Sequence, residues 1–307
     1  MTTLVLLNPH AGGGRAAHLQ SPIQSWLAHH APGTELAAPE TILQARARLQ
    51  HLPQSSRVVV VGGDGTLNQV LSAMLAGEHT LGLVPSGSGN DTARALGLHR
   101  APWADALAHA MRGPAHPMDL GQAVFHQDGS TLTVPFLSSF TTGFDSAVGL
   151  RALNGPRWLR GLPRYLLATL RELSALRTWE LQLQLDGTPV HDGAALFAST
   201  LNTRSFGSGM PAVPHARIDD GQLNLLLAGR FGRVATALML PRLLAGWHLG
   251  HPRVHTQAFS RMTLHSRTPV PLAADGEYLG TTRQLELQVL ASALSVVRGP
   301  VSSPGHT

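Results

Sequence analysis

The sequence predicts an N-terminal α/β domain with a mainly parallel sheet, followed by a mostly antiparallel β domain. Two observations carry this prediction. Over residues 1–100, short apolar runs of strand type alternate with helical patterns, as in chains that build parallel sheets. From about residue 116 the apolar runs are short, and Asp-Gly pairs typical of tight turns separate many of them.

The first domain is expected to contain three strands, at 3–7, 57–61 and 80–84. Each of these apolar runs is followed at once by Asn, Gly or Pro. Because the carboxyl ends of parallel strands meet at one edge of a sheet, the loops after these strands could converge on one site. The expected helices of this domain are 15–30, 43–52, 66–76 and 91–96.

The domain boundary is expected after residue 116, so that the first domain spans 1–116 and the second 117–283. Helical stretches interrupt the second domain near 157–176 and 234–247. The last apolar run, within 284–300, could return to complete the first domain, and 301–307 is typical of a disordered tail. The expected strands of the second domain are 132–136, 179–185, 196–201, 223–227 and 262–265.

Two residue types are missing, and their absence excludes several kinds of site. The chain has no cysteine, which removes disulfides, thiolate nucleophiles and cysteine-ligated zinc. All 23 basic residues are arginine, so a Walker-A NTPase, a protein kinase or a Schiff-base enzyme, each of which normally needs a lysine, is not expected. The first residues enter a strand without a basic stretch, and no apolar run reaches the length of a membrane span, so we expect a soluble cytoplasmic protein.

The net charge of +5 is unevenly distributed. Residues 151–177 contain six arginines and one acid, Glu172. Such a surface suits an anionic partner, whether nucleic acid, a membrane surface or a phosphorylated substrate, and it equally suits a solvated helix face. Within it, residues 158–167 are apolar and basic at helical spacing, a pattern that fits contact with an anionic membrane or amphipathic packing on the core.

The strongest local feature is a glycine turn, Gly62-Gly63-Asp64-Gly65-Thr66, that joins a run of four valines to a predicted helix. Glycines let backbone amides approach phosphate oxygens, and a helix N-terminus adds partial positive charge. The spacing matches neither a P-loop nor a dinucleotide fingerprint. Asp64 could act through a metal, hold a ribose hydroxyl, or simply cap the turn. Similar glycine-rich loops follow the other two strands, at 8–15 and 85–91.

Taken together, eight short motifs in order resemble the diacylglycerol kinase catalytic-domain family, which includes bacterial soluble lipid kinases and the sphingosine and ceramide kinases. The resemblance covers nearly the whole chain. The matching segments are Asn8-Pro9 with Gly12; Gly62 to Thr66 with Asn68; Gly87 to Asp91; Met118-Asp119-Leu120-Gly121; Thr142-Gly143-Phe144-Asp145; Asn202 with Gly207-Ser208-Gly209 and Pro214; Asp219-Asp220-Gly221-Gln222-Leu223; and Asp275-Gly276-Glu277.

The resemblance implies an ATP- and Mg²⁺-dependent lipid kinase with its active site in the cleft between the two domains. Glu277, with Asp275 nearby, would take the proton from the lipid hydroxyl. Residues two apart on an extended chain point to the same side, so both carboxylates are expected to face one pocket, unless Asp275-Gly276 is merely a hairpin turn. The residues implied to bind the nucleotide are Asn8, Pro9, His10, Ala11, Gly12, Arg15, Gly62, Gly63, Asp64, Gly65, Thr66, Asn68, Gly87, Ser88 and Asn90.

The family pattern also implies a structural Mg²⁺. Its ligands would be the Asp220 side chain and the backbone oxygens of Arg217 and Gln222, an oxygen donor set that suits a hard cation. Asp91 and Asp119 would join this site through water and tie the domains together. The 17 histidines, by contrast, contain no HExxH motif, and no histidine metal site is expected.

Three positions depart from the family pattern: Gly13, where a basic residue is usual, Gln69, where a glutamate is usual, and the altered segment around Thr41. They keep two alternatives open, a nucleotide-binding regulatory protein with weak or no kinase activity and an NAD kinase. The expected partner is a lipid acceptor at the membrane surface, with a peripheral position on the inner membrane face, no nucleic acid, and a homodimer through an exposed sheet edge as a further option. The lipid itself is not determined by the sequence.

Overall fold

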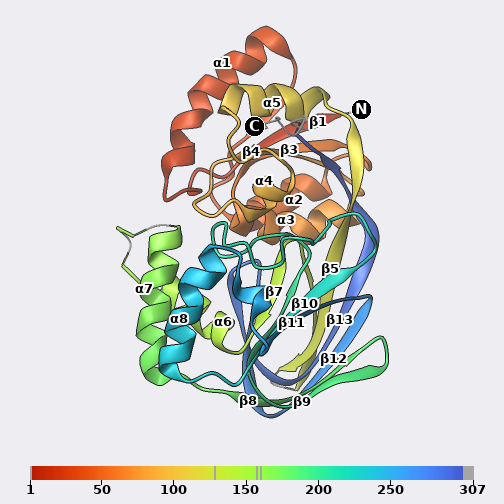
Figure 1. Ribbon diagram of the computed structural model, residues 1–307. Helices are drawn as coiled ribbons and strands as arrows, with labels where there is room; N and C mark the ends of the chain where they lie inside the picture. Colours follow the sequence, from red (N-terminus) through yellow and green to blue (C-terminus); the bar gives the residue numbers. More distant parts are fainter. Residues whose placement is uncertain (1, 128, 157, 160, 300–307) are drawn as a thin grey trace, which may run out of the picture. The chain divides into compact units, whose positions relative to one another are not determined.

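The structure is a computed structural model that describes residues 2–127, 129–156, 158–159 and 161–299 (Figure 1). It divides into two units, Met1–Met118 with Ser292–Thr307 (unit 1) and Asp119–Ala291 (unit 2). The chain passes from one unit to the other within β5 (Ala115–Gln127) and again within β13 (Glu277–Val297). The first crossing lies two residues beyond the expected boundary, and the second unit also takes residues 284–291. The expected tail, 301–307, lies outside the described residues.

Unit 1 is built on a parallel sheet, as the sequence predicts. Its strands are β1 (Thr3–Leu7), β2 (Glu35–Ala37), β3 (Arg57–Gly62) and β4 (Thr80–Pro85), in the order β4-β3-β1-β2. The last part of β13 adds a further parallel strand beside β4, with Ser295 opposite Thr80 and Val296 opposite Leu81. This last part of β13 belongs to unit 1.

Helices cover the sheet of unit 1 on both faces, which explains why its strands are continuous apolar runs. Val5, Leu7, Val59 and Val61 pack with residues of α1 and α5 on one face. The intervening residues of β1 and β3 are also buried, on the opposite face. The helices are η1 (Arg15–Leu19), α1 (Gln20–His30), α2 (Ile42–Gln50), α3 (Asp64–Ala76), α4 (Asp91–Ala95) and α5 (Trp103–Arg112). The short strand β2 and the helix α5 were not predicted.

Unit 2 is a mostly antiparallel β unit, again as predicted. The sheet order is β11-β10-β9-β7-β12-β13; β8 pairs with β9 and β12, and β5 pairs with β6 and β13. β9 and β12 are long enough that each pairs with both β7 and β8. The further strands are β6 (Ser130–Phe136), β7 (Ser139–Thr142), β8 (Trp179–Leu185), β9 (Thr188–Leu201), β10 (Leu223–Gly229), β11 (Val254–Phe259) and β12 (Arg261–Ala274).

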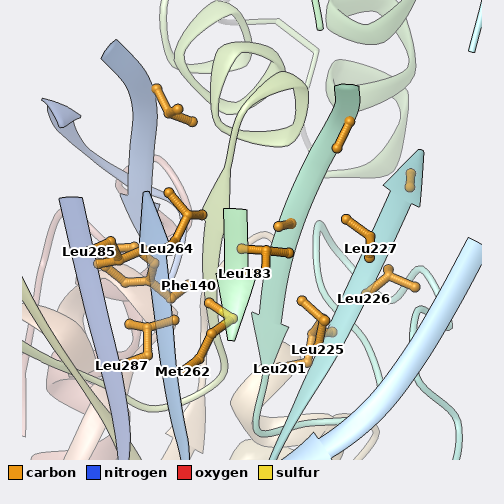
Figure 2. Packing of buried hydrophobic residues seen from close by; sticks show 14 of the residues in the cluster. Phe140, Leu183, Leu201, Leu225, Leu226, Leu227, Met262, Leu264, Leu285 and Leu287 are labelled. Atoms are coloured by element: carbon orange, nitrogen blue, oxygen red, sulfur yellow. The ribbon is translucent and has the colours of Figure 1, made fainter. Parts of the chain in front are cut away.

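The core of unit 2 is formed by residues that alternate along these strands. On β8, residues 181, 183 and 185 are buried leucines, whereas the three polar residues between and before them are exposed. Figure 2 shows Leu183 beside Phe140, with Leu201 and Leu225 on neighbouring strands and Leu264 on the other side. This two-residue period is the one expected for strands with a single buried face.

Three helices accompany this sheet: α6 (Phe144–Leu153), α7 (Leu162–Glu172) and α8 (Arg233–Leu244). α6 packs against α7, and α8 contacts the short turn η2 (Leu173–Ala175) that follows α7. Two residues of the expected helical stretch 157–176, at 157 and 160, lie outside the described residues. Among the helices that the structure describes, none combines the length and the apolar character needed to cross a membrane.

Candidate active site

The three glycine-rich loops of unit 1 contact one another at the carboxyl ends of β1, β3 and β4. Asn8 Nδ2 donates a hydrogen bond to Thr66 Oγ1 at 2.8 Å, which joins the first loop to the second. A Cβ atom placed on Gly12 would lie 2.4 Å from the Ser86 carbonyl oxygen, so the first loop also touches the third. A Cβ atom on Gly63 would lie 2.6 Å from Gly87 Cα, which joins the second loop to the third. The structure thus brings together three segments that the sequence separates.

These close approaches explain why the loops require glycine. Gly12 has φ +60°, a left-handed conformation, and any side chain there would also meet the Ser86 backbone. Where Gly63 and Gly87 meet, the space is filled by the backbone of the two glycines and by the Asn90 Oδ1 atom. The second loop leads directly into α3, whose N-terminal amides carry partial positive charge and have no partner in the helix. Backbone packed in this way suits an anionic group such as a phosphate.

Asp64 ties the second loop to α4. Its two carboxylate oxygens accept hydrogen bonds from the backbone N–H groups of Asp91 and Thr92, each at 2.9 Å. Both donors are at the first turn of α4, so Asp64 satisfies amides that the helix itself leaves unpaired. Of the roles considered for this residue, the structure shows a capping role, directed at a neighbouring helix rather than at its own turn.

Asn90 shapes the third loop from within. Its Oδ1 atom accepts from the Gly87 N–H at 3.0 Å, and its Nδ2 atom donates to the Gly87 carbonyl at 3.1 Å. In the first loop, the Asn8 Oδ1 atom accepts from the His10 N–H at 2.9 Å, and Arg15 Nε donates to the Gly12 carbonyl at 3.1 Å. Of the remaining predicted residues, Gly62 is buried at the end of β3. The others lie in the same loops or in the first turns of α3 and are not buried: Pro9, Ala11, Gly65, Asn68 and Ser88.

The acidic pair of unit 2 lies at a tight hairpin, not on an extended strand. Asp275 and Gly276 have φ angles of +48° and +86°, and they form a two-residue turn between the paired residues Ala274 and Glu277. The expectation that Asp275 and Glu277 point to one side of an extended chain is therefore wrong. The hairpin turn, considered in the sequence as the simpler interpretation, is the local structure.

The Asp275 carboxylate is buried and holds the segment between β6 and β7. It accepts hydrogen bonds from the N–H groups of Leu137 at 2.9 Å, Ser138 at 2.7 Å and Ser139 at 3.1 Å. The Ser138 hydroxyl donates a fourth bond, at 2.8 Å. Four donors stabilise the ionised form of a carboxylate. Ser138 was not predicted as a site residue, and no motif in its segment signals the role.

Glu277 follows the turn and is half-buried. Burial raises the pKa of the Glu277 carboxyl above its usual value, and the negative charge of Asp275 raises this pKa further. A carboxylate with a raised pKa is a better proton acceptor than an exposed one. The hairpin also contacts α7, because a Cβ atom on Gly276 would lie 3.5 Å from the Tyr165 hydroxyl.

The predicted metal loop, residues 217–222, contacts Asp119 within unit 2. Asp119 Oδ2 accepts from the Gly221 N–H at 2.7 Å, and the Asp119 N–H donates to the Ile218 carbonyl at 2.7 Å. Asp220 Oδ1 accepts from the Gln222 N–H at 3.1 Å. Asp91, the remaining predicted member, belongs to unit 1. Among the described residues, no three acidic or histidine side chains are grouped closely enough to hold a metal by themselves, so such a site would also need backbone oxygens.

Comparison with known proteins gives the family. The model of the diacylglycerol kinase catalytic domain matches residues 2–123, and that of the YegS C-terminal NAD kinase beta sandwich-like domain matches residues 138–298, about half of the chain. The chain is 34% identical over 242 residues to a diacylglycerol kinase of Mycobacterium tuberculosis (strain ATCC 25618 / H37Rv), covering 78% of this chain and 76% of the relative. The chain belongs to the diacylglycerol kinase family of lipid kinases.

Solved structures show how widely the fold of this family member is shared. A diacylglycerol kinase from Bacillus anthracis str. Sterne has a TM-score of 0.70 at 18% identity, with 98% of both chains covered. Yeast NADH kinase complexed with NADH has a TM-score of 0.54 at 10% identity, covering 98% of this chain and 84% of the yeast chain. The resemblance found in the sequence is thereby confirmed at the level of the family and the fold.

Proposed function

We propose that this lipid kinase transfers the γ-phosphoryl group of ATP to a hydroxyl of diacylglycerol or a closely related lipid. The observation that carries the proposal is the acidic hairpin. It offers Glu277, with a raised pKa, beside a carboxylate that four hydrogen bonds hold in place. Glu277 accepts the proton of the acceptor hydroxyl, the hydroxyl oxygen bonds to the γ-phosphorus, and the bond to the bridging oxygen breaks to release ADP.

Asp275 then has a positioning role. Its carboxylate fixes the turn that carries Glu277, and its charge supports the raised pKa of the base. We do not assign Asp275 the role of a second proton acceptor, because both of its carboxylate oxygens already receive hydrogen bonds from the β6–β7 segment.

The three loops of unit 1 are the proposed phosphate site. Their support is the close backbone packing at Gly12, Gly63 and Gly87 together with the N-terminus of α3. Arg15 is exposed and adds a positive charge beside the first loop. The side chains of Asp64 and Asn90 act indirectly, because each holds loop backbone in place.

Magnesium suits the donor atoms that the proposal assigns to it. The Asp220 carboxylate and several backbone carbonyls lie on the 217–222 loop, and the Asp119 carboxylate on β5 contacts this loop. All of these oxygens are hard ligands. Beside Asp119 lies Asn202, whose buried Oδ1 atom has no hydrogen-bond partner among the described residues. Arg217 and Gln222 would contribute carbonyl oxygens, and Asp91 a water-mediated contact. Magnesium bound with ATP would separately neutralise charge on the phosphates.

The proposal predicts that Glu277→Gln removes transfer of labelled γ-phosphate from ATP to diacylglycerol in mixed micelles. Loss of a general base typically costs about 10²- to 10⁴-fold in rate. The measurement is labelled lipid formed with and without Mg²⁺, and nucleotide binding should persist in the variant. Glu286→Gln, at an exposed glutamate on the same strand, is the matched control and should keep its rate.

A second acceptor belongs in the same experiment. The fold shared with yeast NADH kinase makes NAD the specific alternative. Label on NAD alone would replace the lipid proposal with a dinucleotide kinase. ATP binding without any labelled product would instead indicate a regulatory protein, with Gly13 and Gln69 as the first positions to restore.

A further inference from the structure

Large apolar side chains that are exposed gather in one part of unit 2. Of the nine that the described residues contain, seven lie between residues 153 and 247, on α6, α7 or α8 or in the turns beside them. Trp158 and Trp247 are 79% and 75% exposed. Isolated exposed leucines are normal, whereas a concentration of this kind marks an interaction surface. We refer to Trp158, Leu170, Val234, Leu238, Leu244 and Trp247 as the α7–α8 surface.

α8 is apolar nearly all round, yet the protein covers little of it. Thr236 is its single buried residue, although Met239 and Leu243 pack partly against the core. Val234, Leu238 and Pro241 are exposed at helical spacing and form a stripe on the outer side. A helix at a water-exposed surface normally presents polar residues on that side. This stripe is therefore suited to an apolar environment.

α8 begins next to the end of α7. The Arg233 guanidinium, at the start of α8, donates to the Ser174 carbonyl at 2.9 Å, just beyond the end of α7. α8 also contacts η2, which follows α7, and the view of Figure 1 draws α7 and α8 next to each other. Trp158 precedes α7 in the chain and Trp247 follows α8. Tryptophan is enriched where proteins meet the boundary between lipid tails and headgroups.

The charge around the α7–α8 surface indicates which kind of partner it fits. The sequence has no acidic residue between Asp220 and Asp275, and Glu172, the one acid in 146–178, pairs with Arg151. Arg171 and Arg242 are exposed on α7 and α8. Apolar side chains rimmed by arginine complement an anionic bilayer, because the apolar groups enter the acyl region while the guanidinium groups meet phosphates.

The same helix pair reaches the acidic hairpin. Tyr165, on the inner side of α7, has its hydroxyl 3.5 Å from the position of a Cβ atom on Gly276, next to Glu277. We propose that the α7–α8 surface docks on an anionic bilayer and presents the acceptor lipid to the Glu277 hairpin from the membrane side. This inference rests on the proposed function, and it assigns to that function a membrane-contact surface.

The test is sedimentation of the full chain with vesicles of phosphatidylcholine alone and of equal parts phosphatidylcholine and phosphatidylglycerol. We expect binding to the anionic vesicles, a blue shift of tryptophan emission on binding, and weakening by added salt. Val234→Asp with Leu238→Asp should reduce the affinity by about tenfold or more, because two apolar side chains no longer enter the bilayer. The matched control is Leu43→Asp, at a leucine of α2 that is 73% exposed and lies in unit 1.

The outcomes separate this inference from the proposed function. Vesicle binding needs no turnover, so a chain that binds vesicles but phosphorylates no lipid would overturn only the proposed function. The double variant should phosphorylate a water-soluble short-chain diacylglycerol at the wild-type rate and lose only activity on vesicles. Wild-type protein that ignores anionic vesicles, or a double variant that binds them as tightly as Leu43→Asp does, would overturn the docking surface. So would a wild-type dimer in sedimentation velocity that the double variant converts to monomer, since a second copy would then cover the helices.

Discussion

Two aspartates of unit 2, the buried Asp275 and the partly buried Asp145, differ in the hydrogen bonds that support their carboxyl groups. Asp275 receives four hydrogen bonds, three of them from backbone N–H groups. Asp145, in the first turn of α6, receives a hydrogen bond from the Ser199 hydroxyl at 2.8 Å. Burial raises the pKa of Asp145 to about 7, and the Ser199 hydrogen bond only partly opposes this shift. The number of donors, not the residue type, distinguishes the two sites.

The raised pKa of Asp145 predicts a pH-dependent loss of stability. Between the ordinary pKa of an aspartate, near 4, and about 7, the unfolded chain is ionised while the folded chain keeps its proton, so the free energy of unfolding falls as pH rises. Asp145→Asn cannot ionise and can still accept from Ser199. Relative to wild type, its stability should therefore rise by up to about 1.4 kcal/mol per pH unit across this window and level off above it.

Urea unfolding of wild type and Asp145→Asn at pH 5, 6, 7 and 8 measures this difference. Asp192→Asn, at an exposed aspartate of the same unit, is the control and should track wild type at every pH. A stability difference between Asp145→Asn and wild type that stays constant from pH 5 to 8 would contradict the assignment.

At the scale of elements, the short helices of this protein obtain their N-terminal caps in different ways. α4 has only five residues, too few to be stable alone, and its first amides are satisfied by Asp64 of the second loop. α2 instead begins with its own capping box, in which Thr41 and Gln44 bond each other's backbone N–H groups. Thr41 therefore has a structural role as the N-cap residue of α2. The sequence left this role open because the segment around Thr41 departs from the family pattern.

Removal of the Asp64 carboxylate should loosen α4 and the third loop. Asp64→Ala leaves the N–H groups of Asp91 and Thr92 without their acceptors, and the loss of a helix cap costs about 0.5–2 kcal/mol. We expect faster amide hydrogen exchange across α4 and a lower melting temperature. Asp64→Asn, which keeps one acceptor oxygen, should fall between wild type and Asp64→Ala. Unchanged exchange in both variants would show that α4 does not need this cap.

At the scale of the whole molecule, the last part of β13 completes the sheet of unit 1. It pairs in parallel with β4, and it buries Leu294, Val296 and Val297. The first unit therefore needs residues that follow the entire second unit in the chain.

Truncation after Ala291 tests this dependence. It removes three buried apolar side chains, each contributing about 1.5–3 kcal/mol, and it exposes the edge of β4. Limited proteolysis with mass spectrometry should show early cuts in residues 1–118 while the strands of unit 2 stay protected. Truncation after Gly299 is the matched control and should leave the cutting pattern unchanged. Equal protection of unit 1 in both truncations would contradict the role of this strand.

The sequence by itself determined the class of each unit and the position of most elements. The valines of β3 and the leucines of β1 are consecutive because both faces of a parallel sheet are covered, and such a run is recognisable locally. The glycine loops are also recognisable locally, because their backbone conformation restricts which residues can occupy those positions. The unpredicted β2 has three residues and no buried side chain, so its pattern is too short to register.

Only the tertiary structure decided what the acidic residues do. The Asp275 carboxylate accepts hydrogen bonds from Leu137 and Ser139, which lie 138 and 136 positions earlier in the chain. Asp64 caps a helix whose first residue, Asp91, lies 27 positions later. Periodicity and turn composition record the conformation of neighbouring residues, but they carry no information on which distant amide meets a given carboxylate. The same holds for α7 and α8, whose apolar residues predict helices yet do not say which side the core will cover. Contacts between residues far apart in the sequence settle these points, because partner and burial are properties of the folded chain.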